Sequence, residues 1–411
     1  MIPMITRLRF SNFWFPVRIC KQTHVALTGL QPTGIPHLGN YLGAIKPCME
    51  LRDSGKLSQL FLIIADLHAL TSNNNGLALS QAILDLASTL VACLFKGEKS
   101  PLNTCQQSLF LQSSVIGHTE LAWVLASTCS LPRLSHLPQW RDKSGFYDQV
   151  NTEGPEKVTA ALIPNADPFL KASVGLFTYP ILQAADIMLY GSDLVPVGVD
   201  QTTHIELARY LVGAATRRWP DLESCLRIPT GLITNTPKIN SLRDPTKKMS
   251  KSDPSLGGAI FLSDSPDTIR SKVRRAQTDS IRSIYYDVEH RPGVSNLLRI
   301  LAAMENRSMD EVISLVSGWN KETLKSRVVD VLVQELGPIR VRIENLRTTP
   351  EGRSQIDSYL SDGSLVANRI AQTRLTQIYS AIGLKLPNSS LTTLPMFNHS
   401  CLDSNFTVAK S

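Results

Sequence analysis

The stretch Thr28-Gly-Leu-Gln-Pro-Thr-Gly-Ile-Pro-His-Leu-Gly-Asn-Tyr-Leu-Gly-Ala44 decides how we interpret the fold of this 411-residue chain. An apolar run, residues 25–28, leads into it and predicts a short buried strand. Glycines and prolines then disfavour regular structure for about ten residues. From Leu38 onward apolar residues recur at helical spacing, so a helix should begin near His37. A strand, a glycine-rich loop and a helix N-terminus in this order present free backbone N–H groups to a phosphate, which predicts a nucleotide site.

Polar side chains within this stretch strengthen the nucleotide interpretation. His37 and Asn40 can add donors at the start of the helix, and Gly39 allows a flat ring to approach the backbone. The alternative is a plain structural turn, which has the same glycine-rich composition. The spacing His-x-Gly-Asn favours the nucleotide site over the turn.

Composition limits the class of protein further. The chain is long enough for two domains, and its net charge of +7 suits a polyanionic partner without proving one. No uninterrupted apolar run reaches the roughly 18 residues of a membrane span, so we expect a soluble protein. The seven cysteines stand at 20, 48, 93, 105, 129, 225 and 401. Their spacing fits neither a metal site nor a disulfide framework, so we expect reduced thiols.

The N-terminal residues are basic and free of acids. Residues 1–22 include Arg7, Arg9 and Arg18, interspersed with aromatic residues, and the first carboxylate of the chain is Glu50. This composition is typical of a mitochondrial transit peptide. The alternative is a disordered basic N-terminus of a cytosolic protein.

Strand and helix patterns alternate after the glycine-rich loop. Apolar strands are predicted over residues 60–65 and 108–112, with an amphipathic helix over 79–95 between them. Ser113 and Ser114 could cap the helix that follows. The alternation predicts an α/β fold with a doubly wound parallel sheet. Asp66 and His68 follow the first of these two strands, at the sheet edge where such folds bind ligands.

A helix over residues 179–190 should begin at its proline, Pro180, after a long loop that starts near residue 142. It carries Asp186 among apolar residues, and an acid in that setting is costly without a partner. Asp186 is either a cap or salt-bridge residue or a carboxylate that faces a ligand. The residues alone leave both possibilities open.

Two further segments belong to the same sheet edge or near it. The strand at 194–198 is followed by Asp200 and Gln201, which open a helix and could be simple caps. Residues 245–253 contain Lys247, Lys248 and Lys251 with two serines, and this composition predicts an exposed loop. Its ammonium groups would suit a departing pyrophosphate, whose charge grows as it leaves.

Several ordered motifs together resemble one family. His37-Leu-Gly-Asn40 and Lys248-Met-Ser-Lys-Ser252 are similar to the paired signatures of class I aminoacyl-tRNA synthetases. Within that class the chain resembles the tryptophanyl-tRNA synthetases of the bacterial and mitochondrial type, over roughly residues 25–386. Further matching stretches begin at Gly29, Gly175, Ala184, Val195, Asp244, Ala276 and Gly293. One departure is Val199, where the family usually has Glu.

The resemblance implies a domain organisation. A Rossmann-like catalytic domain would span residues 23–265, with a long insertion at 145–173, and an all-helical anticodon-binding domain would span 266–387. Residues 388–411 are polar and expected to be disordered. The insertion is longer than the family's lysine-bearing loop, so the resemblance does not say which of Lys143, Lys157 or Lys171 reaches the phosphates. Positive charge in the helical region comes from Arg340, Arg342, Arg347, Arg353, Arg369 and Arg374, for which a solvated helix face is the default interpretation.

The resemblance also implies an activity: tryptophan is activated with ATP and Mg²⁺ and transferred to tRNA(Trp), in the mitochondrial matrix, by a homodimer. It assigns catalysis to His37, Asn40, Lys248, Ser250 and Lys251. It assigns ATP binding to these residues and to Gln31, Pro32, Thr33, Gly39, Gly198, Val199, Asp200, Ile239, Met249 and Ser252. It assigns tryptophan binding to Leu27, His68, Tyr179, Gln183, Asp186, Val195, Val197 and Gln201. A tyrosyl-tRNA synthetase, which shares the Tyr179, Gln183 and Asp186 pattern, and a non-catalytic RNA-binding relative remain the alternatives.

Overall fold

The structure, a computed structural model, describes residues 9–10, 13–14, 24–71, 76–95, 105–137, 173–198, 201–233, 238–251 and 257–384. Within residues 1–22 only 9–10 and 13–14 are described. The expectations for most of residues 1–22 as a leader, for most of the 145–173 insertion and for the tail at 388–411 lie outside the described residues. The same holds for Val199, Asp200 and Ser252.

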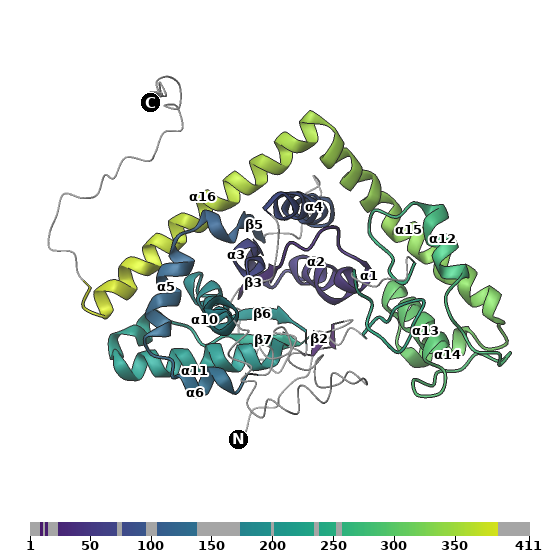
Figure 1. The fold of residues 1–411 in the computed structure, drawn as a ribbon, viewed down its shortest axis with the longest axis horizontal. Helices are drawn as coiled ribbons and strands as arrows, with labels where there is room; N and C mark the ends of the chain where they lie inside the picture. Colours follow the sequence, from purple (N-terminus) through teal and green to yellow (C-terminus); the bar gives the residue numbers. More distant parts are fainter. Residues whose placement is uncertain are drawn as a thin grey trace, which may run out of the picture.

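A parallel sheet of five strands forms the centre of the molecule (Figure 1). Its order is β5-β4-β3-β6-β7. The bounds are β3 His24–Leu30, β4 Leu57–Ile64, β5 Gln106–Leu111, β6 Leu194–Val197 and β7 Thr230–Ile233. The chain runs outward from β3 to β5 and then returns to place β6 on the other side of β3. This reversal confirms the doubly wound sheet and puts a topological switch point beside β3. A short antiparallel pair, β1 Arg9–Phe10 and β2 Phe13–Trp14, forms a separate sheet whose strand β2 contacts β7.

Strand β4 shows how the sequence covers both faces of the sheet. Leu60 and Leu62 point to one hydrophobic core, and Phe61 and Ile63 point to the other. Because successive side chains of a strand alternate, a continuously apolar strand must be covered on both sides. The first face carries α1 Leu38–Asn40, the π-turn η1 Tyr41–Ile45, α2 Lys46–Asp53 and α4 Gly76–Leu94. The second carries α5 Gly117–Ala126, α6 Leu131–Ser135, α10 Val174–Leu189, α11 Thr202–Arg218 and η5 Pro220–Ser224.

Helix α4 is the one described helix that is long and apolar enough to cross a membrane by length and composition alone. Its second half, from Asp85 to Leu94, is buried in the fold. Helix α4 packs against α15 and β4, so it is a core helix of this structure. The cysteines among the described residues, including Cys93 of this helix, are free thiols.

The chain from residue 266 is almost wholly helical, as the sequence predicts. Its helices are α12 Pro266–Arg274, α13 Pro292–Glu305, α14 Met309–Leu315, α15 Lys321–Thr348 and α16 Pro350–Ala381. Apolar residues of α15 from Leu324 to Leu346 are buried at helical spacing. They share one core with β4 and α4, so packing is continuous across residue 265. The proposed domain boundary there stays a prediction.

The two longest helices meet at Thr349, which caps α16 (Figure 1). Helix α15 packs on α12, α13 and α4, whereas α16 runs back along β5 and α5. Two of the arginines assigned to the helical region tie it to the sheet domain. Arg342 donates to the carbonyls of Ala92 and Phe95, and Arg374 donates to that of Cys225. These two arginines are therefore structural links in addition to being positive charges.

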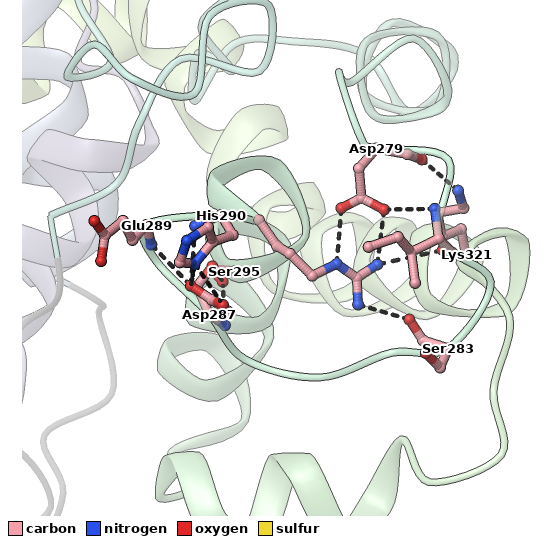
Figure 2. A network of polar contacts seen from close by, with 9 residues as sticks. Asp279, Ser283, Asp287, Glu289, His290, Ser295 and Lys321 are labelled. Carbon is pink, nitrogen blue, oxygen red and sulfur yellow. Dashed lines mark hydrogen bonds and ion pairs between the residues drawn. The ribbon is translucent and has the colours of Figure 1, made fainter.

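An irregular segment, residues 276–291, joins α12 to α13. The buried guanidinium of Arg291 holds it by donating twice to Asp279, at 2.8 Å each, and once to the carbonyl of Ser283 at 2.7 Å (Figure 2). Lys321, at the start of α15, also donates to the Asp279 backbone carbonyl. A fully buried charge is tolerated here because its donors have partners.

Two helix starts differ from the sequence prediction. Helix α10 begins at Val174 with Ser173 as its cap, so Pro180 lies inside the helix. The Ser173 hydroxyl satisfies an early backbone N–H, and the missing N–H of Pro180 costs only one hydrogen bond of a buried helix. Ser113 and Ser114 do not cap α5, because they belong to the 3-10 turn η2 Gln112–Ser114. Ser113 donates instead to Asp66 of α3 Asp66–Ala69.

Candidate active site

His37 caps the helix that follows the glycine-rich loop. Its Nδ1 accepts from the Asn40 backbone N–H at 3.2 Å, and Asn40 Oδ1 accepts from the His37 N–H at 3.2 Å. This reciprocal box fixes both side chains at the carboxyl end of β3. Gly39 is confined by the same ring, since a Cβ built there would lie 3.0 Å from His37 Cε1. The predicted start of the helix near His37 is confirmed.

His37 is neutral at neutral pH. Burial, together with the positive charges of Lys251 and Lys248, lowers its pKa to about 4. A neutral ring whose Nδ1 is an acceptor must carry its proton on Nε2. His37 can therefore donate one hydrogen bond to an anion without presenting a charge of its own.

Lys251 lies across the glycine-rich loop. Its ammonium group donates to Thr33 Oγ1 at 2.9 Å and to the Gly34 carbonyl at 2.8 Å. Burial lowers the pKa of Lys251 to about 8, and the negative charge of Asp85 opposes this lowering. The structure thus places the lysine segment beside the loop, although the two are more than two hundred residues apart.

The lysine segment is less exposed than its composition predicts. Lys248 is exposed, but Met249 is buried, and Ser250 and Lys251 are half-buried. Met249 donates its N–H to the carbonyl of buried Ile239 at 3.0 Å, and Asn240 next to it is held by Asn296 of α13. Buried Met249 thus hydrogen-bonds to the Ile239 backbone, while the adjacent Lys247 and Lys248 stay exposed.

Asp186 is the centre of the other half of the site. It is 5% exposed and accepts from His68 Nε2 at 3.0 Å and from His118 Nδ1 at 2.6 Å. Gln112 Nε2 lies 2.9 Å from both carboxylate oxygens. These residues come from α10, α3, α5 and the carboxyl end of β5, so Asp186 lies above the sheet edge that the sequence predicts for ligand binding.

The ionised form of Asp186 is strongly favoured. Burial alone would raise its pKa, but the hydrogen bonds and charges of His118 and His68 outweigh burial and hold the pKa well below its usual range. His118 also lies 2.8 Å from the Tyr190 hydroxyl through Nε2. A carboxylate can accept about four hydrogen bonds, and three donor atoms contact this one. Because Gln112 Nε2 contacts both oxygens, the four contacts already engage this capacity, and a further donor would take over one of the two Gln112 contacts.

Gln112, His118 and Tyr190 are site residues that the sequence analysis missed. Gln112 could have been found, because it follows β5 directly and therefore stands at the same sheet edge as Asp66. His118 lies on α5 and Tyr190 directly follows the end of α10; both stand among apolar residues and carry no local signal. Only the folded structure brings them to Asp186.

Of the remaining residues assigned to tryptophan, Tyr179 contacts His68, a partner of this carboxylate. The Tyr179 ring packs edge-on against His68 with ring centroids 6.0 Å apart, and its hydroxyl lies 3.3 Å from His204 Nε2. Gln183 donates to Gln201 at 3.3 Å. Leu27, Val195 and Val197 belong to the same hydrophobic core or pack against it. Among the residues assigned to ATP, Gln31, Pro32, Thr33 and Gly198 follow β3 or β6.

Comparison with known proteins identifies the family. The profile described as "tRNA synthetases class I (W and Y)" matches residues 21–336. A mitochondrial tryptophan–tRNA ligase of Schizosaccharomyces pombe is 37% identical, over 79% of this chain and 86% of its own. The tryptophanyl-tRNA synthetase structure from Mycoplasma pneumoniae superimposes with a TM-score of 0.71 at 32% identity, covering 89% of this chain and 99% of that one.

A second solved structure bears on the site. The tryptophanyl-tRNA synthetase of Campylobacter jejuni, complexed with ADP and tryptophan, has a TM-score of 0.63 at 27% identity and covers 87% of this chain and 99% of that one. The motifs, the parallel sheet and these similarities agree. The chain belongs to the class I tRNA synthetases for tryptophan and tyrosine and, within them, to the tryptophan–tRNA ligases of the bacterial and mitochondrial type.

Proposed function

We propose that this chain activates tryptophan with ATP and transfers it to tRNA(Trp) for mitochondrial protein synthesis. The observation that carries the proposal is the ionised, buried Asp186 beside an apolar core, where an incoming donor can replace one of the two contacts made by Gln112. An indole N–H is a donor on an apolar ring, so the two match. Relatives that bear this activity span most of the chain.

The first step joins the tryptophan carboxylate to the α-phosphorus of ATP and releases pyrophosphate. A carboxylate is already a nucleophile at neutral pH, so catalysis here consists of positioning and charge stabilisation. His37 and Asn40 would hold the phosphates, with Ser250 beside them. Lys248 and Lys251 would neutralise the departing pyrophosphate. Lys251 must first exchange its bonds to Thr33 and Gly34 for the phosphate.

The fit of Mg²⁺ follows from the donors at this end. Lysines, an imidazole, an amide and the Thr33 hydroxyl lie near the loop. The one carboxylate described there, that of Asp85, is already engaged by Arg347 and Gln81, so the described side chains offer Mg²⁺ few ligands. An ion that arrives with ATP would therefore take its oxygen ligands from the phosphates and from water. When bound, it would supply charge to the leaving group.

At the amino acid, Asp186 would accept the indole N–H, with His68, Gln112 and His118 holding its carboxylate in place. Leu27, Val195 and Val197 would line the ring pocket, and Tyr179, Gln183, Gln201 and His68 would contact the ammonium and carboxylate ends. Gly39, Ile239 and Met249 would shape the ATP site with Gln31, Pro32, Thr33 and Gly198. Val199, Asp200 and Ser252 are assigned to ATP by the family resemblance alone.

In the second step the 2′-hydroxyl of the terminal tRNA adenosine attacks the acyl carbon of the adenylate. An ester bond forms, the acyl-phosphate bond breaks, and AMP leaves. The helical region from residue 266 would receive the anticodon. Compartment and assembly complete the proposal: residues 1–22 would direct import into the matrix, and the enzyme would act as a homodimer.

Amino-acid-dependent exchange of labelled pyrophosphate into ATP tests the chemistry. Tryptophan should support exchange, and tyrosine should support far less. Exchange with tyrosine alone would assign the chain to the tyrosyl enzymes, and no exchange with either would favour a non-catalytic relative. Protein lacking residues 1–22 should aminoacylate mitochondrial tRNA(Trp) transcripts, and a reporter fused to those residues should enter mitochondria unless Arg7, Arg9 and Arg18 are replaced by Glu.

A further inference from the structure

A cavity of about 460 Å³ lies where α4, α15, the start of α16 and the segment after Leu262 meet. Three guanidinium groups line it, from Arg340, Arg347 and Arg353, with the polar groups of Gln81 and Ser263. Glu344 is the one carboxylate among the residues that line it. This arginine pocket, as we call it, contains none of the residues assigned above to tryptophan or ATP.

The carboxylates nearby do not neutralise the three arginines. Glu344 pairs with Arg340 at 3.1 Å, but 63% of its side chain is exposed. Asp85 pairs with Arg347 at 2.8 Å. Arg353 donates Nε to the backbone carbonyl of Arg347 at 3.0 Å, which satisfies a donor without cancelling its charge. Three positive charges thus face two negative ones.

Two donors in this pocket lack partners among the residues that the structure describes. The Nε groups of Arg340 and Arg347 are buried and make no hydrogen bond within that part of the chain. An unmade hydrogen bond of a buried charged donor is costly. A ligand that brings several acceptor oxygens into the pocket would remove this cost once the two guanidinium groups turn toward it.

We propose that the arginine pocket binds a phosphate group. Guanidinium forks match the oxygens of a phosphate in geometry and charge better than ammonium groups do, and the Ser263 hydroxyl can donate as well. The cavity volume exceeds that of one phosphate, so the group can be a free phosphate or a phosphodiester of bound RNA. Both sources present the same chemistry to the arginines.

The pocket is connected to Lys251 through Asp85. The carboxylate of Asp85 holds Arg347 and Gln81 on one oxygen, and its other oxygen lies 3.9 Å from a Cβ built on Gly34. Lys251 donates to the carbonyl of that same glycine. A phosphate that draws Arg347 toward itself would leave more of the Asp85 charge facing Lys251. This link rests on the function proposed above for Lys251, whereas binding in the pocket does not.

Calorimetric titration of inorganic phosphate into the full chain tests the binding. A non-hydrolysable tryptophanyl-adenylate analogue occupies the catalytic site during the titration. The wild type and Lys251→Ala should bind phosphate alike, and the double variant Arg340→Gln/Arg353→Gln should bind at least about tenfold more weakly. Arg369→Gln, an exposed arginine elsewhere on α16, is the matched control and should bind as the wild type does.

Equal binding by the double variant and the wild type would overturn the proposal, as would loss of binding in Lys251→Ala alone. If the double variant has a lowered melting temperature, the single variant Arg353→Gln is used in its place. Arg353 is exposed, and this change removes one guanidinium from the pocket. A wild type that binds phosphate but shows no tryptophan-dependent exchange would reject the proposed function and leave the pocket standing.

Kinetics then separate the two sources of phosphate. If RNA supplies it, Arg353→Gln should raise the KM for tRNA and lower the slope of log affinity against log salt by about one. Exchange without tRNA should stay unchanged in that case. If free phosphate is the ligand, the KM for tRNA should stay unchanged, and added phosphate should alter exchange in the wild type but not in the variant. Unchanged values in all of these assays would contradict the proposal.

Discussion

At Asp186 the polar contacts of the carboxylate join buried side chains, whereas at Lys251 the ammonium group contacts the loop that a nucleotide would cover. Asp186 is held by two histidines and a glutamine. Lys251 is held by a threonine hydroxyl and a glycine carbonyl. The first arrangement is complete before a ligand arrives, and the second has to be exchanged when phosphates bind.

This difference follows the demands of the two ligands. Discrimination between amino acids needs an acceptor that is fixed before binding, because a preorganised group loses little entropy on recognition. Stabilisation of a departing pyrophosphate needs a charge that meets the leaving group in the transition state more than in the ground state. We expect the two regions to respond differently to substitution.

The largest expected effect is at Lys251. Lys251→Ala should slow adenylate formation by about 10²–10³-fold, as the loss of other transition-state donors does. Tryptophan affinity should barely change, because the partner of this lysine is the leaving group. Single-turnover kinetics with a separate tryptophan titration measure both quantities. Lys247→Ala, an exposed neighbour, is the control. If Lys251→Ala lowered tryptophan affinity as much as the rate of adenylate formation, the two regions would not differ in the way described.

Asp186→Asn comes next. A neutral amide replaces a charged acceptor, and charge-assisted hydrogen bonds contribute roughly 1.5–3 kcal/mol, so kcat/KM for tryptophan should fall at least about tenfold. Phenylalanine has no ring N–H, so its poor activity should change much less. A melting curve completes the test. Equal losses for both substrates together with a lower melting point would make Asp186 a structural residue only.

A substitution at Gly363 of α16 should disturb the packing near Asp186 without touching the residues around Lys251. A Cβ there would lie 2.0 Å from the Leu109 carbonyl of β5, the strand that leads to Gln112. Gly363→Ala should therefore destabilise the fold by about 1–3 kcal/mol through overpacking. It should also raise the KM for tryptophan more than that for ATP. Gly337→Ala on α15, where a Cβ meets nothing within 4 Å, should be neutral or stabilising. Urea unfolding compares the two variants, and equal stabilities would disprove the close contact.

The smallest effect concerns pH. Burial lowers the pKa of Lys251 to about 8, so its charge is present below that pH and is lost as the pH rises through it. The kcat/KM for ATP, which reports the free enzyme, should fall about twofold at pH 8 and further above it. In Lys251→Arg the decline in kcat/KM should occur at a higher pH, because a guanidinium stays charged. If kcat/KM declined at the same pH in both proteins, the titrating group would be one other than Lys251.

The sheet was predictable because its strands are continuous apolar runs that end in polar residues. Val25–Thr28, Leu60–Ala65 and the helix from Leu38 follow directly from local pattern, and each is present within a few residues. The two ends of the site were predictable as motifs, since His37, Asn40 and Lys251 stand at fixed spacings. Their contact across the loop required the resemblance to a family.

What local pattern could not give is pairing between distant helices. His118 looks like a polar residue on an apolar helix, and only the packing of α5 against α10 brings it to Asp186 and to Tyr190 at the end of α10. The helix start predicted at Pro180 is wrong. Proline is common in the first turn of a helix, but α10 begins earlier, at Val174, with Ser173 as its cap. The sequence predicts a solvated helix face for Arg342 and Arg347, but Arg342 donates to backbone carbonyls and Arg347 pairs with Asp85.

The placement of α16 on the edge strand β5 has a consequence for the timing of folding. Asn368 of α16 donates to the Ser114 carbonyl at 2.9 Å, and the two residues lie 254 positions apart in the chain. At typical synthesis rates that interval lasts on the order of 10–50 s. During this time the apolar edge of β5 is uncovered, and it can pair with any other strand it meets. The nascent chain therefore carries an open sheet edge until its last long helix leaves the ribosome, and this interval is when a chaperone would protect it most.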